Sequence, residues 1–113
     1  MSDILLTQEQ QELRDMFRDF AQKEIIPISA EYDEKGEFPK GVFQKAVDMG
    51  LTTLGLPEAY GGSGEGALTG SILSEELGYA DAGFAASVGA CNLASIPVMM
   101  HGDERQKRLV ADI

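Results

Sequence analysis

The sequence has few cysteines and few basic residues, and both shortages narrow what the protein can be. A single cysteine, Cys91, rules out an internal disulfide and is typical of a reduced, cytoplasmic setting. The sequence contains 9 lysines and arginines but 19 acidic residues, so its net charge of -10 repels nucleic acid and anionic membrane surfaces. We therefore expect neither as a partner. The opening residues MSDILLTQ contain no basic region followed by an apolar run, so no signal peptide is expected.

The sequence does contain one long stretch without a charged side chain between its ends. This stretch runs from Asp81 to Gly102, DAGFAASVGACNLASIPVMMHG, in a chain that is 25% charged. Asp81 can cap the start of a helix, and the pair His101-Gly102 can end it. A helix that is apolar on every side is expected to be buried on every side. The pattern thus predicts a buried central helix at about residues 81–102, with Cys91 inside it as a small hydrophobic residue.

Three interpretations of this stretch compete. Its length would span a bilayer, but alanine, glycine, serine and asparagine insert poorly. Its many small side chains would let another helix pack closely, or would leave room for a ligand. From the pattern alone, a tightly packed core helix is favoured over a ligand wall, and both are favoured over a membrane span.

The first half of the chain is typical of helices. Thr7 and Gln10 form a capping box, and apolar residues then recur at helical spacing. Pro27 predicts a kink or break near Ile26, with a short helical continuation to Tyr32. The polar residues 33–37 are expected to form a loop. A second helix is expected to begin near Pro39 and to end at Gly50, while the apolar run 51–56 could be a strand or a further helical turn.

The second half continues in the same way. A third helix is expected from Gly66 or Ala67 to Ala80, and a last one from Glu104 to at least Asp112, capped by Asp103. The apolar residues of the third helix that should point inward are Leu68, Ile72, Leu73 and Leu77. The fold class is therefore all-α, an orthogonal or up-down bundle of five or six helices around the buried central helix, in one domain of residues 1–113.

Two features invite a chemical interpretation. Gly62, Gly64 and Ala67 satisfy the dinucleotide-binding pattern G-x-G-x-x-A, but a proline-broken segment precedes them and no βαβ unit follows, so a plain loop between helices is favoured. Glu75 and Glu76 resemble a catalytic pair, yet neighbouring residues on a helix point about 100° apart. A solvated or helix-bridging role is favoured for them.

In order along the chain, the segments LTQEQQELRDMFRDFAQKEIIPISAEYD, FPKGVFQKAVDMGL, LPEAYGGSG, SEELGYADAG and HGDERQKR resemble the N-terminal helical domain of the acyl-CoA dehydrogenases. The resemblance covers essentially the whole chain and keeps the family's order and spacing. It departs after Gln106-Lys107, where the family usually has an aromatic-Leu-Pro or similar sequence and this chain has Leu109-Val110-Ala111. Complete members continue into a β domain and a second helical domain, which these 113 residues are not expected to include.

The resemblance implies α,β-dehydrogenation of an acyl-CoA thioester by a complete enzyme that carries FAD. The family's catalytic glutamate and most of its flavin contacts belong to the absent parts, so no catalytic residue, cofactor-binding residue or metal ligand is predicted in this chain, which alone should be inactive. The resemblance also implies that the central helix forms one wall of the acyl-chain cavity. The positions that match cavity-lining residues are Ala85, Ala86, Gly89 and Leu93.

Two alternatives remain open at this stage. One is a flavin-dependent oxygenase or oxidase built on the same scaffold, because the distinction lies outside these residues. The other is a stand-alone helical binding module without catalytic activity. A domain that normally packs its cavity side against other domains should expose an apolar patch when alone, so we also expect a homo-oligomer.

Overall fold

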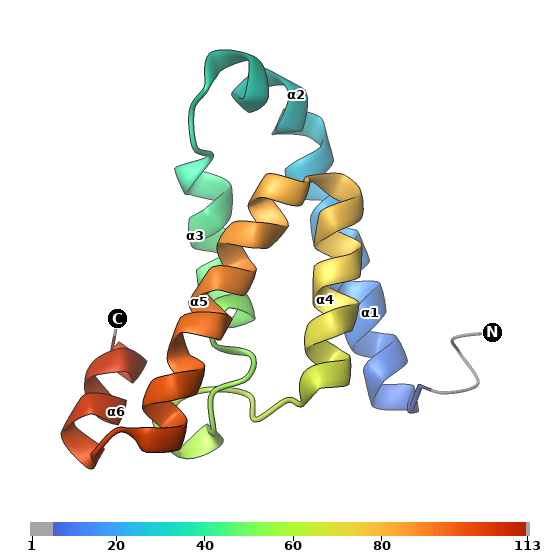
Figure 1. The fold of residues 1–113 in the computed structure, drawn as a ribbon. Helices are drawn as coiled ribbons and strands as arrows, with labels where there is room; N and C mark the ends of the chain where they lie inside the picture. The colour runs from blue at the N-terminus through green and yellow to red at the C-terminus, as the bar shows by residue number, and fades with distance from the viewer. Residues whose placement is uncertain (1–5, 113) are drawn as a thin grey trace.

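The described part of the chain, residues 6–112 of a computed structural model, consists of helices joined by short turns (Figure 1). Six α-helices follow one another with no strand among the described residues: α1 (Gln8–Phe20), α2 (Ile26–Lys35), α3 (Lys40–Asp48), α4 (Ala67–Ala80), α5 (Ala82–His101) and α6 (Glu104–Asp112). The predicted all-α class is therefore confirmed, and the strand alternative for residues 51–56 is wrong, because Leu51–Thr53 forms a 3-10 turn.

The predicted helix ends are formed by the residues that the sequence marks. Thr7 Oγ1 accepts a hydrogen bond from the Gln10 N–H, and the Gln10 side chain accepts one from the Thr7 N–H. Asp103 and Gln106 repeat this reciprocal arrangement before α6. Gly50 adopts the left-handed conformation with φ 79° after α3, as its place in the sequence predicts. These contacts need only local sequence, which is why they can be predicted.

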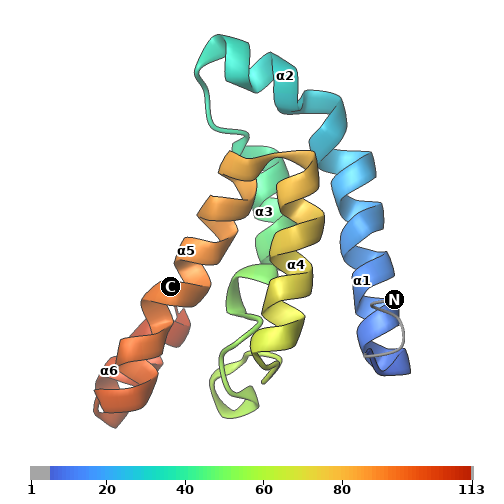
Figure 2. The same ribbon diagram turned by 45° about the vertical axis from the view of Figure 1, so that its right-hand side comes forward.

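Pro27 bends the chain without ending the helix. One wide π-helical turn, Ala21–Ile25, separates α1 from α2, and the Ile26 N–H donates to the Ala21 carbonyl. The wider turn accommodates the proline, which has no N–H and whose ring crowds the preceding turn. Figures 1 and 2 show α2 leaving α1 at an angle. The predicted loop at residues 33–37 is mostly wrong, because α2 continues through Lys35 and ends at the left-handed Gly36.

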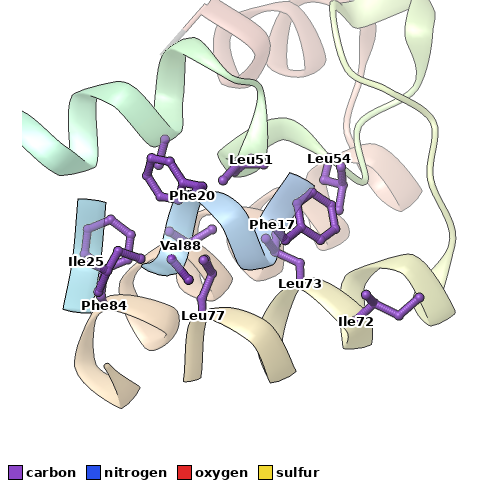
Figure 3. Packing of buried hydrophobic residues seen from close by; sticks show 12 residues of the cluster. Phe17, Phe20, Ile25, Leu51, Leu54, Ile72, Leu73, Leu77, Phe84 and Val88 are labelled. Carbon is purple, nitrogen blue, oxygen red and sulfur yellow. The ribbon is translucent and has the colours of Figure 1, made fainter. Parts of the chain in front are cut away.

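A hydrophobic cluster joins α1, α3, α4 and the start of α5 (Figure 3). Phe84 is the main contribution of α5, with its ring centroid 6.4 Å from that of Phe20 and 5.9 Å from that of Phe43. The predicted inward residues Ile72, Leu73 and Leu77 are buried in this cluster, whereas Leu68 is exposed. The cluster thus holds one face of α4 and only the first turns of α5.

The prediction that α5 is buried on every side is wrong. Its extent is nearly as expected, but only Phe84, Val88 and Ser95 are buried, and Cys91 is exposed. The thinnest dimension of the domain is 18 Å, which is about two helix layers at an interaxial distance of about 8–10 Å. Two layers can cover one side of a helix but cannot surround it. Its length and mean hydropathy of 1.4 would suffice for a membrane span, but these properties are shared by helices that pack within proteins.

Asp81 connects α4, α5 and α2. Its Oδ1 accepts from the Phe84 N–H at 2.9 Å, and its Oδ2 accepts from the Ser29 hydroxyl at 2.6 Å. The hydrogen bond from Ser29, followed by that from Phe84, holds the pKa of the Asp81 carboxyl below its usual value. A carboxyl whose pKa is depressed on folding stabilises the native state above its unfolded pKa of about 3.9, and this contribution is lost as pH falls through the folded pKa.

We expect Asp81→Ala to lower the free energy of unfolding by about 1 kcal/mol at neutral pH, because α5 loses its N-cap and Ser29 loses its acceptor. The difference from wild type should narrow in acid, where the wild-type carboxyl is also protonated. Urea unfolding of wild type and of Asp81→Ala, from neutral pH into acid, measures this difference in the free energy of unfolding. Asp33→Ala, at an exposed position, is the control, and a difference independent of pH would contradict the prediction.

Candidate functional site

A groove of about 580 Å³ lies between α4 and α5. Along the chain, Asp81 alone connects α4 to α5. The two helices diverge away from this residue in both ribbon views (Figures 1 and 2). Leu54, Leu73, Leu77 and Val88 contribute buried apolar side chains to it. The other lining residues are Gly55, Glu65, Gly66, Ala67, Gly70, Ser71, Ser74, Ala85, Gly89, Asn92, Leu93, Ser95 and Ile96. Its volume is within the usual range for small-molecule sites.

The groove exists because the facing side chains are small. Gly66, which precedes α4, and Gly70 and Ser74 within it recur every four residues and so lie on one side of the helix. On α5, Ala85 and Gly89 do the same. A Cβ atom built at Gly66, Gly70 or Gly89 would meet no other atom within 4 Å, so the space beside these glycines is open. The small residues therefore do not bring the two helices together here but leave room between them.

Three of the four residues predicted to contact substrate lie together in this groove. Ala85, Gly89 and Leu93 are spaced four residues apart on α5 and all line it. Leu93 is 67% exposed and lies at its margin. Ala86 is exposed and does not belong to the lining. Substrate binding by all four residues stays a prediction.

Sequence reasoning missed the opposite wall. Gly70, Ser71 and Ser74 of α4 face the α5 residues across the groove. The signal for them was present as small residues at four-residue spacing, the same pattern that marks Ala85 and Gly89. The periodicity of large apolar residues marks the inward side of α4 and gives no signal for the small ones.

Asn92 attaches one side of the groove to the turn that follows α3. Its Nδ2 donates to the Leu51 carbonyl at 2.9 Å and to the Val88 carbonyl at 3.3 Å, while its Oδ1 accepts from the Gly55 N–H at 3.4 Å. The amide is thus occupied by backbone groups. It holds residues 51–55 against α5, which places Leu54 in the groove.

Glu65 is the one ionisable side chain among the groove's lining residues. Its Oε2 accepts from the Thr69 hydroxyl at 3.1 Å, and its backbone N–H donates to the Leu54 carbonyl at 3.0 Å. Thr69 is 1% exposed, so one end of this contact is inside the domain. The groove is otherwise lined by apolar groups and small neutral side chains.

The glycine loop before α4 does not fit a phosphate-binding cradle. Phosphate-binding loops present free backbone N–H groups. In this loop, by contrast, four backbone N–H groups donate to carbonyls within residues 54–64. The donors are Gly61, Gly62, Gly64 and Glu65. A carboxylate at Glu65, next to the first turn of α4, would also repel phosphate. The structure therefore supports the plain-loop interpretation of the G-x-G-x-x-A pattern.

The two remaining acidic candidates are also accounted for. Glu76 is buried and receives two hydrogen bonds from the Arg18 guanidinium, at 2.8 and 3.1 Å, so it bridges α4 to α1 as one of the predicted roles requires. Glu75 is exposed. Within residues 6–112, no group of three or more His, Cys, Asp or Glu side chains could hold a metal ion.

Comparison with known proteins places this geometry in a family. Residues 7–111 match the family described as acyl-CoA dehydrogenase, N-terminal domain. The chain is 40% identical over 104 residues to a probable acyl-CoA dehydrogenase, YngJ, of Bacillus subtilis, covering 91% of this chain and 27% of that protein. It is 34% identical over 105 residues to the acryloyl-CoA reductase (NADH) of Anaerotignum propionicum, covering 93% and 27%.

A solved structure shows the same fold. The chain is similar to butyryl-CoA dehydrogenase from Megasphaera elsdenii, with a TM-score of 0.84 and 31% sequence identity, over 95% of this chain and 30% of that one. The chain thus spans between a quarter and a third of the length of these relatives. The similarity concerns their N-terminal domain, and their whole-protein activities are a separate question.

Proposed function

This chain belongs to the acyl-CoA dehydrogenase family through its N-terminal domain, and we propose that this domain forms one wall of an acyl-chain site in a flavin-dependent enzyme that acts on acyl-CoA thioesters. The reaction proposed for the complete enzyme is α,β-dehydrogenation of the thioester. The observation that carries the proposal is the groove between α4 and α5, where Ala85, Gly89 and Leu93 occupy positions implied by the resemblance.

The chemistry of the groove suits an acyl chain. Buried apolar side chains line its depth, and the small residues on its walls leave the space free. Burying an apolar chain there is favourable by about 0.8 kcal/mol per methylene group. The phosphates of CoA find no cation among the lining residues, so the acyl part is the portion of the substrate that this groove can hold.

The catalytic step is assigned to parts of the enzyme other than these residues. A flavin would supply the oxidising chemistry, but the backbone N–H groups of Gly61, Gly62, Gly64 and Glu65 already donate to carbonyls of residues 54–58, so this loop is a poor cradle for the flavin's phosphates. This domain contributes positioning of the acyl chain and exclusion of water from it. The 113 residues alone are accordingly expected not to turn over an acyl-CoA.

Gly89→Leu in the full-length protein tests the proposal. The leucine side chain would enter open space in the groove and should exclude long acyl chains while admitting short ones. Lost methylene contacts and overpacking of roughly 1–3 kcal/mol should change the long-to-short ratio of kcat/KM by about one to two orders of magnitude. Steady-state kinetics with a series of straight-chain acyl-CoA substrates gives this ratio.

Gly41→Leu is the matched control, because Gly41 is also helical and has open space beside it but lies on α3, away from the groove. It should leave the ratio unchanged. Since a Cβ at Gly89 meets no neighbour, the melting temperature of Gly89→Leu should stay close to that of wild type. A lowered melting temperature with an unchanged chain-length ratio would show that this part of α5 serves packing only.

A further inference from the structure

We propose that Glu65 makes the groove selective for acyl thioesters with an uncharged tail, against those whose tail ends in a second carboxylate. This inference rests on the proposed function and goes beyond it, because it names the class of acyl group and the residue that discriminates. It assigns Glu65 a role as a specificity-determining residue, with no part in the chemical step.

The backbone and the side chain of Glu65 are both held in place at the wall of the groove. Its N–H donates to the carbonyl of Leu54, which is itself a buried lining residue. Its carboxylate accepts from Thr69, one turn further along α4, at 3.1 Å. Because Thr69 is 1% exposed, its hydroxyl has little solvent to bond instead. These two hydrogen bonds therefore hold Glu65 in place beside the groove.

No lysine, arginine or histidine side chain among the groove's lining residues compensates the charge of Glu65. The lining consists of Glu65, apolar residues, glycines, serines and Asn92, whose amide is occupied by the backbone of residues 51, 55 and 88. A second carboxylate entering the groove would lose water and meet a like charge, and both effects are unfavourable. A methyl-ended tail would meet neither cost, so the lining distinguishes the two kinds of tail.

The position of Glu65 along the groove adds to its discrimination between charged and uncharged tails. Glu65 precedes the first turn of α4, the end at which the ribbons of α4 and α5 have diverged (Figures 1 and 2). At this end Leu93 and Ile96 contribute exposed apolar side chains from α5. Because Glu65, Leu93 and Ile96 all line the groove, an acyl tail that reaches this end of it comes near Glu65.

The test compares hexanoyl-CoA with adipoyl-CoA, which have the same number of carbon atoms and differ in the terminal carboxylate. The full-length protein should have a much higher kcat/KM for hexanoyl-CoA. Glu65→Gln keeps an acceptor for Thr69 but removes the charge, and it should reduce this preference by about tenfold, the size of a like-charge interaction of about 1.4 kcal/mol at intermediate dielectric. Raising the ionic strength should lower the preference of wild type more than that of the variant.

Glu75→Gln is the matched control, because it removes the same charge from an exposed position on α4 outside the groove. It should leave the preference unchanged. An unchanged preference in Glu65→Gln, with activity on hexanoyl-CoA retained, would overturn the inference and leave the proposed function standing. If no acyl-CoA thioester, of any chain length, is a substrate of the wild-type protein, the proposed function itself fails. Equal effects of Glu65→Gln and Glu75→Gln would also overturn the inference, because they would show a response to net charge alone.

Discussion

Gly62→Ala is expected to lower the free energy of unfolding by about 3 kcal/mol, the upper part of the range for overpacking. A Cβ atom at Gly62 would overlap the carbonyl oxygen and the Cβ of Leu56, and Leu56 is buried. Backbone cannot move aside as the end of a long side chain can. The loop would have to shift, which would weaken the hydrogen bond from the Gly64 N–H to the Leu56 carbonyl and move Leu54 in the groove.

Urea unfolding followed by circular dichroism measures this loss. Gly41→Ala is the control, because a Cβ there meets no atom within 4 Å and Gly41 lies in α3. Alanine in a helix is more stable than glycine by roughly 0.5–1 kcal/mol, so this variant should be slightly stabilised. A loss below about 1 kcal/mol for Gly62→Ala would mean that the loop has more freedom than its close contact with Leu56 indicates.

Arg18→Met should destabilise the domain by about 2 kcal/mol, because it leaves the Glu76 carboxylate buried without its partner. The Glu76 side chain is 10% exposed and that of Arg18 is 50% exposed. Breaking a fully buried pair costs roughly 3–5 kcal/mol, and solvent around the arginine reduces this cost. Methionine retains most of the apolar stem of the arginine, so the change tests the charge rather than the packing.

The double variant Arg18→Met with Glu76→Leu should recover most of that loss, because replacing both partners by apolar groups removes the unpaired charge. Comparison of the two single variants and the double variant by urea unfolding gives the coupling energy. The exposed pair Lys35 and Glu31 is the reference, and Lys35→Met should change stability by less than about 0.5 kcal/mol. Equal losses for Arg18→Met and Lys35→Met would show that burial of Glu76 contributes nothing.

Three residues on one wall of the groove could be predicted from the sequence, whereas its second wall could not, because periodicity marks the inward side of a helix by its large apolar residues. The four-residue spacing of Ala85, Gly89 and Leu93 follows from helix geometry, and the resemblance to a family supplied their role. Ala86 is adjacent to Ala85 in the sequence but lies outside the lining. The positions of Glu65 and Asn92 depend on the turn at residues 51–55, whose path over α5 comes from contacts between residues distant in sequence.

The sequence by itself determined the helices and their ends, because capping pairs such as Thr7 with Gln10 and left-handed glycines such as Gly50 act within a few residues. It also determined the uncharged character of α5. Only the tertiary structure decided what that character serves. Burial depends on what packs above a surface, and two helix layers leave most of α5 uncovered, with Cys91 exposed and an open groove beside Gly89. An apolar helix can equally be enclosed or form a wall, and its composition is the same in both cases.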